Sequence, residues 1–237
     1  MENEVYCIIP ARDEEESITS TINGIIEHSP IAKKNIIVVN NASKDKTKQK
    51  VLNMGVLVLD CNKIGYGNAC LTAINWILVK NLNPKWILFC DADGSDDPKD
   101  IQNLIKQIQT KTIDLLIGSR TLGKAEKGSL SNIQIFGNWL VCSLVKIFFN
   151  KEYTDMGPLR IIGFNQLKQL DMEDKTWGWN IEMLVKAIQN NLTIKEVPVV
   201  YRKRKFGVSK ISGTLIMAMR VGFKILYTFF RLYFFKP

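Results

Sequence analysis

The segment Trp86-Ile87-Leu88-Phe89-Cys90-Asp91-Ala92-Asp93 joins an uninterrupted apolar run to two carboxylates one residue apart. A short run without polar alternation is typical of a strand buried on both faces, as in a parallel sheet covered by helices. In such sheets, ligands bind beyond the carboxyl ends of the strands, where Asp91 and Asp93 stand. The segment therefore predicts both an α/β fold and the place of its site.

The flanking sequence repeats short apolar runs separated by segments with helical spacing. Strands are expected at Val5–Ile9, Ile36–Val39, Val56–Leu59, Trp86–Cys90, Asp114–Gly118, Leu159–Ile162 and Glu196–Tyr201. Helices are expected at Glu14–Glu27, from the Asn40–Lys44 cluster to about Asn53, and at Ala69–Val79, Asp97–Gln109, Ser131–Phe149 and Trp179–Gln189, with a Gly/Lys-rich loop at Leu122–Ser129. This alternation predicts an α/β protein with a mostly parallel sheet between layers of helices.

Composition excludes several classes of chemistry. The chain has 237 residues, of which 46% are hydrophobic and 23% charged, so a folded protein with a sizeable core is expected. Five cysteines without a C-x-x-C pair favour a reducing compartment over a disulfide framework or a thiolate zinc site. A single histidine, His28, argues against catalytic triads and multi-histidine metal sites. The acidic start Met1–Glu4 lacks signal-peptide features, so a cytoplasmic protein is expected.

The net charge of +9 is concentrated near the C-terminus. Residues 195–237 hold ten Lys/Arg and one acid, Glu196, whereas residues 1–194 are balanced. Such a tail suits nucleic acid, an anionic membrane surface or a phosphorylated substrate. Nucleic acid is disfavoured, because long apolar runs separate the cations.

The apolar segment Leu215–Phe235 carries Arg220, Lys224 and Arg231 on one helical face. Three charges make a membrane-spanning helix costly, so we expect a basic amphipathic helix lying on an anionic membrane, formed by residues 213–237 after a domain at 1–212. The cations would face the headgroups, and the aromatic residues would lie in the apolar and interfacial zone: Phe223, Tyr227, Phe229, Phe230 and Tyr233. The alternative is a helix packed on the body of the domain or on a partner.

Two motifs between strands and helices have chemical interpretations. Asp91 and Asp93 can hold a divalent cation whose remaining ligands come from a diphosphate, or they can belong to an ordinary turn cluster. The stretch Lys63-Ile64-Gly65-Tyr66-Gly67-Asn68-Ala69 partly matches the G-x-G-x-x-G fingerprint of dinucleotide-binding proteins. The third glycine is replaced by Cys70, so a tight turn into a helix is the competing interpretation.

In combination the motifs resemble family 2 glycosyltransferases of the GT-A fold. The resemblance is carried by Ile9-Pro10-Ala11-Arg12-Asp13-Glu14-Glu15, Val38–Thr47, the glycine turn, Asp91-Ala92-Asp93 and Gly118-Ser119-Arg120. Later segments are similar to the polyprenyl-phosphate (dolichol-phosphate mannose synthase) branch: Asp155–Arg160, Trp177–Met183, Val197-Pro198 and Gly207-Val208-Ser209-Lys210. The resemblance implies a GT-A, Rossmann-like sheet followed by the amphipathic helix.

The resemblance also implies a donor site and a metal site. The donor-binding residues would be Pro10, Arg12, Glu14, Asn41, Lys63, Gly65, Asp91 and Ala92. Asp91 and Asp93 would bind Mg²⁺ or Mn²⁺. Asn40-Asn41 replaces the acidic pair of the family and Ser95 replaces a frequent glutamine, so the nucleobase stays open between UDP- and GDP-hexoses.

On the acceptor side, the resemblance places the lipid phosphate at Arg120, Lys127, Ser131 and Arg204. The expected catalytic residues are Asp93, Arg120, Asp155 and Glu182. Asp155 and Glu182 are either general bases for a hydroxyl acceptor or braces for Arg120 or Arg204. A phosphate acceptor needs no base, because it is already ionised near neutral pH.

The expected activity is metal-dependent, inverting transfer of a hexose from a nucleotide-diphosphate sugar to polyprenyl (dolichyl or undecaprenyl) phosphate at the cytoplasmic membrane face. The alternatives are transfer to a hydroxyl of another lipid or glycan, and a non-catalytic nucleotide-sugar-binding membrane protein. A homo-oligomer is also open, because the helix Ser131–Phe149 has no charge before Lys146 and can pack in the core, in a dimer or against lipid.

Overall fold

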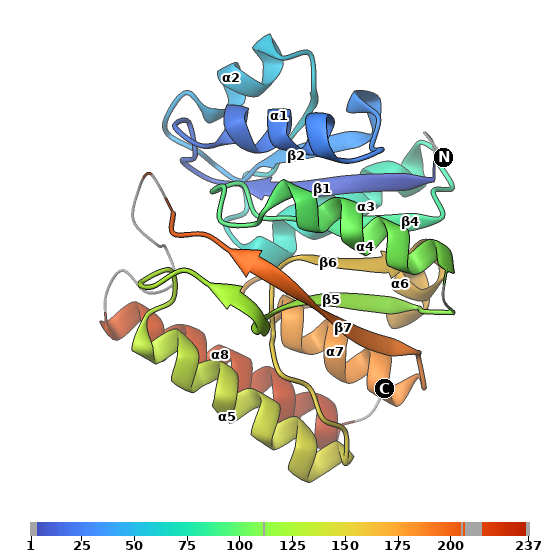
Figure 1. The fold of residues 1–237 in the computed structure, drawn as a ribbon, viewed down its shortest axis with the longest axis vertical. Coiled ribbons are helices and arrows are strands. Elements are labelled where there is room, and N and C mark those ends of the chain that lie inside the picture. Colours follow the sequence, from blue (N-terminus) through green and yellow to red (C-terminus); the bar gives the residue numbers. More distant parts are fainter. Residues whose placement is uncertain (1–3, 111, 205, 207–214, 236–237) are drawn as a thin grey trace.

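The computed structural model describes residues 4–110, 112–204, 206 and 215–235. These residues form one seven-stranded sheet in the order β3-β2-β1-β4-β6-β5-β7 (Figure 1). The strands are β1 (Val5–Ala11), β2 (Ile36–Asn40), β3 (Leu57–Asp60), β4 (Trp86–Phe89), β5 (Leu115–Ala125), β6 (Arg160–Gly163) and β7 (Ile194–Tyr201). Only β6 runs antiparallel to its neighbours, β4 and β5, which confirms the prediction of a mostly parallel sheet.

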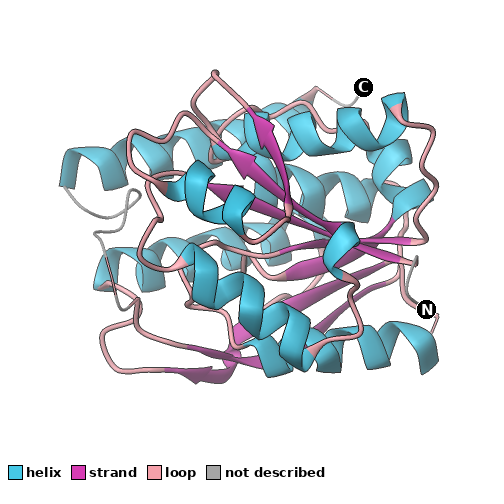
Figure 2. Ribbon diagram, turned by 90° about the horizontal axis from the view of Figure 1, so that it is seen from above, coloured by secondary structure: helices cyan, strands magenta, loops and turns pink. Residues whose placement is uncertain are grey.

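Helices cover both faces of the sheet (Figure 2). They are α1 (Ile18–His28), α2 (Thr47–Asn53), α3 (Tyr66–Val79), α4 (Pro98–Thr110), α5 (Asn132–Phe149), α6 (Phe164–Leu170), α7 (Trp179–Gln189) and α8 (Leu215–Phe234), with a 3₁₀ turn at Lys33–Asn35. Successive residues of β1 alternate between the two apolar cores, with Ile8 packed among α3 and α7 residues and Ile9 among α1 and α4 residues. Strands β1 to β4 begin within one residue of the positions that the apolar runs predicted.

Several elements differ from the sequence expectations: α3 begins at Tyr66 rather than Ala69, for example, and β7 at Ile194 rather than Glu196. β5 continues to Ala125, so the first half of the expected loop Leu122–Ser129 is strand paired with β7 across an irregularity between Ser119 and Lys124. α1 begins at Ile18 rather than Glu14, because Asp13 has a φ of 51° and the Glu14 amide donates to Thr47 Oγ1, which holds these residues in a turn. Helix α6 was not expected.

Helices α5 and α8 lie side by side along the lower edge of the molecule in Figure 1. Phe148 of α5 makes edge-to-face contacts with three aromatic rings of α8, at Phe229, Phe230 and Tyr233. The outer sides of both helices are apolar and open: Phe136 and Trp139 are 59% and 60% exposed, and Phe223 is 72% exposed. Within the described residues, α5 is the one helix whose length and apolar composition suffice to cross a membrane.

The predicted orientation of α8 is wrong for two of its three cations. Lys224 Nζ lies 2.7 Å from Asp174 Oδ2, and Arg231 Nη1 lies 3.3 Å from Glu173 Oε2, so both point at the domain. Phe229 is fully buried, whereas Arg220 is exposed. The periodicity of the tail could not reveal its carboxylate partners, which come from the segment before α7. The expected boundary at 212/213 and the motif Gly207–Lys210 lie outside the described residues.

Candidate active site

The loop after β4 gathers three carboxylates. The Asp91 amide donates to Asp96 Oδ2 (3.1 Å), and the Ser95 amide donates to Asp93 Oδ1 (2.9 Å). Burial, together with the charges of Asp93 and Asp96, raises the pKa of Asp91 well above its ordinary value. Burial and the charge of Asp93 likewise raise the pKa of Asp96 to about 7. The loop therefore concentrates negative charge that a cation would relieve.

Arg204 supplies positive charge to this loop. Its Nη2 and Nε lie 2.7 and 3.1 Å from Asp93 Oδ2, and its Nη1 lies 3.1 Å from Glu14 Oε1. The end of β7 brings Arg204 there, because Tyr201 pairs with Asp96 and the Arg202 amide donates to Ser95 O (2.7 Å). The structure thus joins Glu14, Asp93 and Arg204, although the sequence assigned Glu14 to the donor, Asp93 to the metal and Arg204 to the acceptor phosphate.

The carboxylates of Asp91 and Asp93 fit a divalent metal bound together with a phosphate ligand. Both are hard oxygen donors of the kind that Mg²⁺ and Mn²⁺ prefer, and Asp93 already accepts a guanidinium cation. No cluster of three or more His, Cys, Asp or Glu side chains able to hold a metal occurs in the described part of the chain. A metal at Asp91 and Asp93 would therefore take further ligands from its substrate or from water.

The glycine turn before α3 is a site of close backbone packing. A Cβ at Gly65 would lie 2.1 Å from Lys175 O, and one at Gly67 would lie 1.9 Å from Asp174 O. The amides of Gly67 and Asn68 donate to Thr176 O and Lys175 O. Because protein carbonyls occupy these amides, the turn does not offer the pyrophosphate cradle of a dinucleotide-binding protein. The tight-turn interpretation is therefore the correct one.

Asn41 braces the chain that follows β3. Its Nδ2 donates to Cys61 O (3.3 Å) and Lys63 O (2.8 Å), and its Oδ1 accepts from the Gly65 amide (2.8 Å). The Lys63 side chain is exposed and lines a separate cavity of about 800 Å³ that also borders α3 and α6. Direct donor contacts by these residues remain predictions.

The other predicted donor residues surround the end of β1. Pro10 pairs with Val39 of β2, and Ala92 O accepts from Thr21 Oγ1 (3.1 Å). The Arg12 Nε atom is buried without a hydrogen-bond partner, and it lies 3.7 Å from Asp13 Oδ2. Pro10 and Arg12 thus lie at the carboxyl end of β1, and Ala92 lies between the two carboxylates of the loop after β4.

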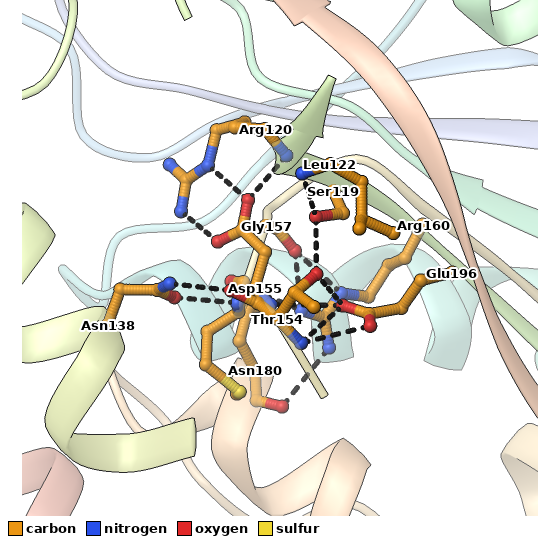
Figure 3. Close-up of polar contacts among 11 residues, drawn as sticks. Ser119, Arg120, Leu122, Asn138, Thr154, Asp155, Gly157, Arg160, Asn180 and Glu196 are labelled. Carbon is orange, nitrogen blue, oxygen red and sulfur yellow. Dashed lines mark hydrogen bonds and ion pairs between the residues drawn. The ribbon is translucent and has the colours of Figure 1, made fainter. Parts of the chain in front are cut away.

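Asp155 braces Arg120, one of the two roles that the sequence allowed. Arg120 Nε and Nη2 lie 2.8 and 2.6 Å from the two Asp155 oxygens, and the Arg120 amide donates to the same carboxylate (2.7 Å) (Figure 3). The guanidinium also lies over the Tyr201 ring, 5.1 Å from its centroid. Burial alone would lower the pKa of Arg120, but the Asp155 hydrogen bonds and charge raise it, so Arg120 is a fixed cation.

Of three further predicted residues, two have structural contacts elsewhere and one is exposed. Glu182 is fully buried in α7, where it accepts from the amides of Glu173 and Asp174 (3.0 and 2.7 Å) and pairs with Lys186. Ser131 caps α5 in a reciprocal pair with Gln134. Lys127 is exposed after β5. No contact among the described residues joins these three to Arg120 or Asp93.

A cavity of about 350 Å³ connects the polar centre to α5 and α8. Asp91, Arg120 and Tyr201 line it, and so do apolar residues of the two helices, at Phe136, Val141, Ala218, Val221 and Ile225. Tyr66 and Trp179 also line it, and the Tyr66 hydroxyl and Trp179 Nε1 are buried without a hydrogen-bond partner. Sequence periodicity missed this cavity, because it forms only when the two distant helices pack together.

A mostly parallel sheet with acidic residues beyond the carboxyl end of a central strand places the chain among the doubly wound α/β proteins, whose ligands bind at that edge of the sheet. The model of glycosyl transferase family 2 matches residues 6–166, so the chain belongs to that family. The fold is that of the GT-A glycosyltransferases. Glucosyl-3-phosphoglycerate synthase of Mycobacterium tuberculosis, crystallised with Mn²⁺, UDP and glucosyl-3-phosphoglycerate, superimposes with a TM-score of 0.73 at 16% identity, covering 95% of this chain and 78% of that one.

Two curated relatives cover almost the whole chain. The undecaprenyl-phosphate mannosyltransferase of Micrococcus luteus is 28% identical, covering 90% of this chain and 89% of its own. The UDP-N-acetylglucosamine–dolichyl-phosphate N-acetylglucosaminyltransferase of Methanococcus voltae is also 28% identical, covering 94% and 93%. The resemblance to the polyprenyl-phosphate sugar transferase branch is therefore confirmed.

Proposed function

We propose that the protein transfers a hexose from a nucleotide-diphosphate sugar to polyprenyl phosphate. The cavity that joins Asp91 and Arg120 to the apolar helices α5 and α8 carries this proposal. A lipid phosphate needs both environments, a cation for its headgroup and an apolar path for its chain. The two curated relatives, named for undecaprenyl- and dolichyl-phosphate acceptors, support the same acceptor class.

The donor would bind across the carboxyl ends of β1, β2 and β4. Asp91 and Asp93 would hold Mg²⁺ or Mn²⁺, which would neutralise the charge of the departing nucleoside diphosphate. Glu14 and Arg12 lie beside this centre and would contact the nucleotide, whose base stays open between uracil and guanine. Arg204 would leave Asp93 when the donor and its metal arrive, and its guanidinium would then be free for the acceptor phosphate.

The acceptor phosphate would lie against Arg120. Asp155 accepts hydrogen bonds from Arg120 Nε and Nη2. The Nη1 edge is therefore the part of the guanidinium that a ligand in the cavity can reach. Lys127 and Ser131 would complete the phosphate site. One phosphate oxygen attacks the anomeric carbon while the nucleoside diphosphate leaves from the opposite side, so a single displacement inverts the anomeric configuration.

A hydroxyl acceptor is disfavoured by the state of the two candidate bases. Asp155 is 1% exposed and holds Arg120 with both oxygens. Glu182 is fully buried and already accepts two backbone amides. Neither carboxylate is placed to remove a proton from an acceptor, whereas a phosphate monoester needs no such base.

We further propose that the exposed sides of α5 and α8 rest on the cytoplasmic face of the membrane. Phe136, Trp139 and Phe223 would enter the interfacial layer near the cavity, so the acceptor chain could pass directly from lipid to the site. Lys224 and Arg231 are paired with the domain, so apolar contact would dominate and Arg220 would add attraction to anionic lipids. Self-association through the same helices stays an alternative use of this surface.

The direct test is sugar transfer from a panel of radiolabelled UDP- and GDP-hexoses into organic-extractable lipid. Polyprenyl phosphate should accept label from at least one donor, and the matched polyprenol without phosphate should not. Transfer to polyprenol, or to water-soluble glycan alone, would favour the hydroxyl-acceptor alternative. Donor binding without transfer to any acceptor would favour a non-catalytic nucleotide-sugar-binding protein.

A further inference from the structure

The segment 154–157 between α5 and β6 has no regular secondary structure, yet side chains from three elements hold its backbone (Figure 3). Arg160 of β6 is fully buried, and its guanidinium donates to the carbonyls of Met156 and Gly157. Burial lowers the pKa of Arg160 to about 10, so the cation is kept at neutral pH despite its buried position. The segment carries Asp155, whose carboxylate orients Arg120.

Glu196 of β7 holds the first half of the segment. Its two oxygens accept from the Thr154 amide (3.0 and 2.9 Å), and Oε1 also accepts from Thr154 Oγ1 and the Asp155 amide, both at 3.0 Å. Glu196 is the one acid among residues 195–237, and its carboxylate faces into the domain toward this backbone. A carboxylate that accepts several hydrogen bonds fixes the atoms that donate them.

Asn138 of α5 holds the backbone on both sides of Asp155. Its Nδ2 donates to Thr154 O (2.9 Å), and its Oδ1 accepts from the Met156 amide (2.8 Å). The side-chain amide therefore pairs with the segment as a neighbouring strand would, and Asp155 is the residue between the two contacts. With the backbone fixed on both sides, the Asp155 carboxylate has little freedom other than to face Arg120.

We propose that Asn138 and Glu196 are positioning residues that set the direction of the Arg120 guanidinium through Asp155. The proposal rests on the proposed function, because Arg120 is taken to bind the acceptor phosphate. An arginine side chain is long and flexible. A carboxylate can keep the Nη1 edge of Arg120 in one direction only if the carboxylate is itself fixed. Neither residue belongs to the motifs that carry the family resemblance, and each contacts Arg120 only through the segment 154–157.

The test compares Asn138→Ala and Glu196→Gln with the wild-type protein. Displacing the guanidinium by about 1 Å should lower kcat/KM for polyprenyl phosphate roughly tenfold to hundredfold. The Kd for UDP or GDP with Mn²⁺, measured by calorimetry, should not change. Ser143→Ala on α5 and Glu152→Gln at an exposed acid are matched controls that should keep wild-type kinetics, because Ser143 donates only within its helix and Glu152 pairs with Lys146.

A readout independent of transfer is the ¹⁵N-arginine spectrum. The Arg120 Nε–H signal, identified by its loss in Arg120→Lys, should be shifted by its Asp155 partner in the wild type and should move or broaden in Asn138→Ala. Asn138→Asp keeps the Oδ1 acceptor and loses the Nδ2 donor, so it should shift the Arg120 signal less. It replaces Asn138→Ala in this test if that variant fails to fold. An unchanged Arg120 signal, or equal losses of donor and acceptor binding, would overturn the positioning role. Absence of transfer by the wild type, with the spectral change present, would instead reject only the proposed function.

Discussion

Asp93 is the residue at which the proposed donor and acceptor halves of the site meet. Its Oδ1 fixes the turn through the Ser95 amide, and its Oδ2 carries the guanidinium of Arg204. The same carboxylate is the expected metal ligand, so a bound metal would compete with Arg204 for it. Residues 111 positions apart in the chain are thus coupled by a single atom.

Replacing Asp93 should abolish most activity while the fold persists. Asp93→Asn removes charge stabilisation that the site holds in place, so transfer should fall by at least about 10²-fold. The measurement is radiolabel transfer alongside circular dichroism. EDTA should lower the transfer activity of the wild type as the substitution does, and added Mg²⁺ or Mn²⁺ should restore it. Full activity in EDTA would show that transfer needs no divalent metal.

Replacing Arg204 should separate metal binding from acceptor use. Arg204→Gln leaves Asp93 Oδ2 without its cation, so Mn²⁺ should bind about fivefold more tightly, the scale of roughly 1 kcal/mol for a partly exposed ion pair. Electron paramagnetic resonance of free Mn²⁺ measures this directly. Transfer should nevertheless fall through a higher KM for polyprenyl phosphate. Weaker Mn²⁺ binding by the variant would show that Arg204 assists the metal rather than competing with it.

At the scale of elements, the hydrophobic pattern of a segment predicts helices and strands whose position depends on that segment alone. Helix α7 lies at Trp179–Gln189, as expected, and strands β1 to β6 begin within one residue of their predicted starts. The extension of β5 depends on pairing with β7, and the orientation of α8 depends on carboxylates at Glu173 and Asp174. Such partners are distant in sequence, so periodicity contains no information about them.

The ion pair between Lys224 and Asp174 should hold α8 on the domain. Asp174 is buried, so Lys224→Met leaves a carboxylate without its cation and should lower the free energy of unfolding by about 1–3 kcal/mol. Arg220→Met, at an exposed cation on the same helix, is the matched control and should stay within about 0.5 kcal/mol of wild type. Chemical denaturation measures both, and equal stabilities of the two variants would contradict the docking role of Lys224.

The same pair predicts how stability depends on pH. Burial raises the pKa of Asp174, but hydrogen bonds from Lys224 and the Thr176 amide outweigh it, so the pKa lies below its ordinary value. A lowered folded-state pKa stabilises the protein above the ordinary carboxyl pKa of about 4, and the contribution is lost as the pH falls further. The stability gap between wild type and Lys224→Met should therefore be constant near neutral pH and shrink below about pH 4. A gap that widens in acid would contradict this sign.

At the scale of the molecule, the donor and acceptor sides of the site differ in how they are built. Polar residues at the carboxyl ends of β1, β2 and β4 form the proposed donor side, and each belongs to a short motif that the sequence displays directly. The acceptor side depends on α5 and α8 packing over Arg120, and no single segment reveals that cavity. Motifs therefore predict which residues gather at these strand ends, and their contacts with a donor remain predictions, whereas the periodicity of the tail predicts the wrong open face for α8.

Membrane association should depend on the apolar side of α5 and α8 rather than on salt. Trp139→Ser and Phe223→Ser each remove an exposed ring, and each should weaken binding to anionic vesicles by at least about tenfold. Leu52→Ser, at an exposed position on α2, should leave binding unchanged. Vesicle flotation in low and high salt measures the effect. Full release of the wild type by high salt would show that Arg220 and other cations dominate instead.

The proposed nucleophile is an oxygen of the lipid phosphate. The most direct measurement is mass spectrometry of the lipid formed from polyprenyl phosphate, a nucleotide sugar and Mg²⁺ or Mn²⁺, followed by acid and base hydrolysis. The predicted product is polyprenyl phosphate bearing one hexose, labile to mild acid, stable to base, and absent with Asp93→Asn. A base-labile product, or equal sugar transfer to polyprenol, would contradict the account.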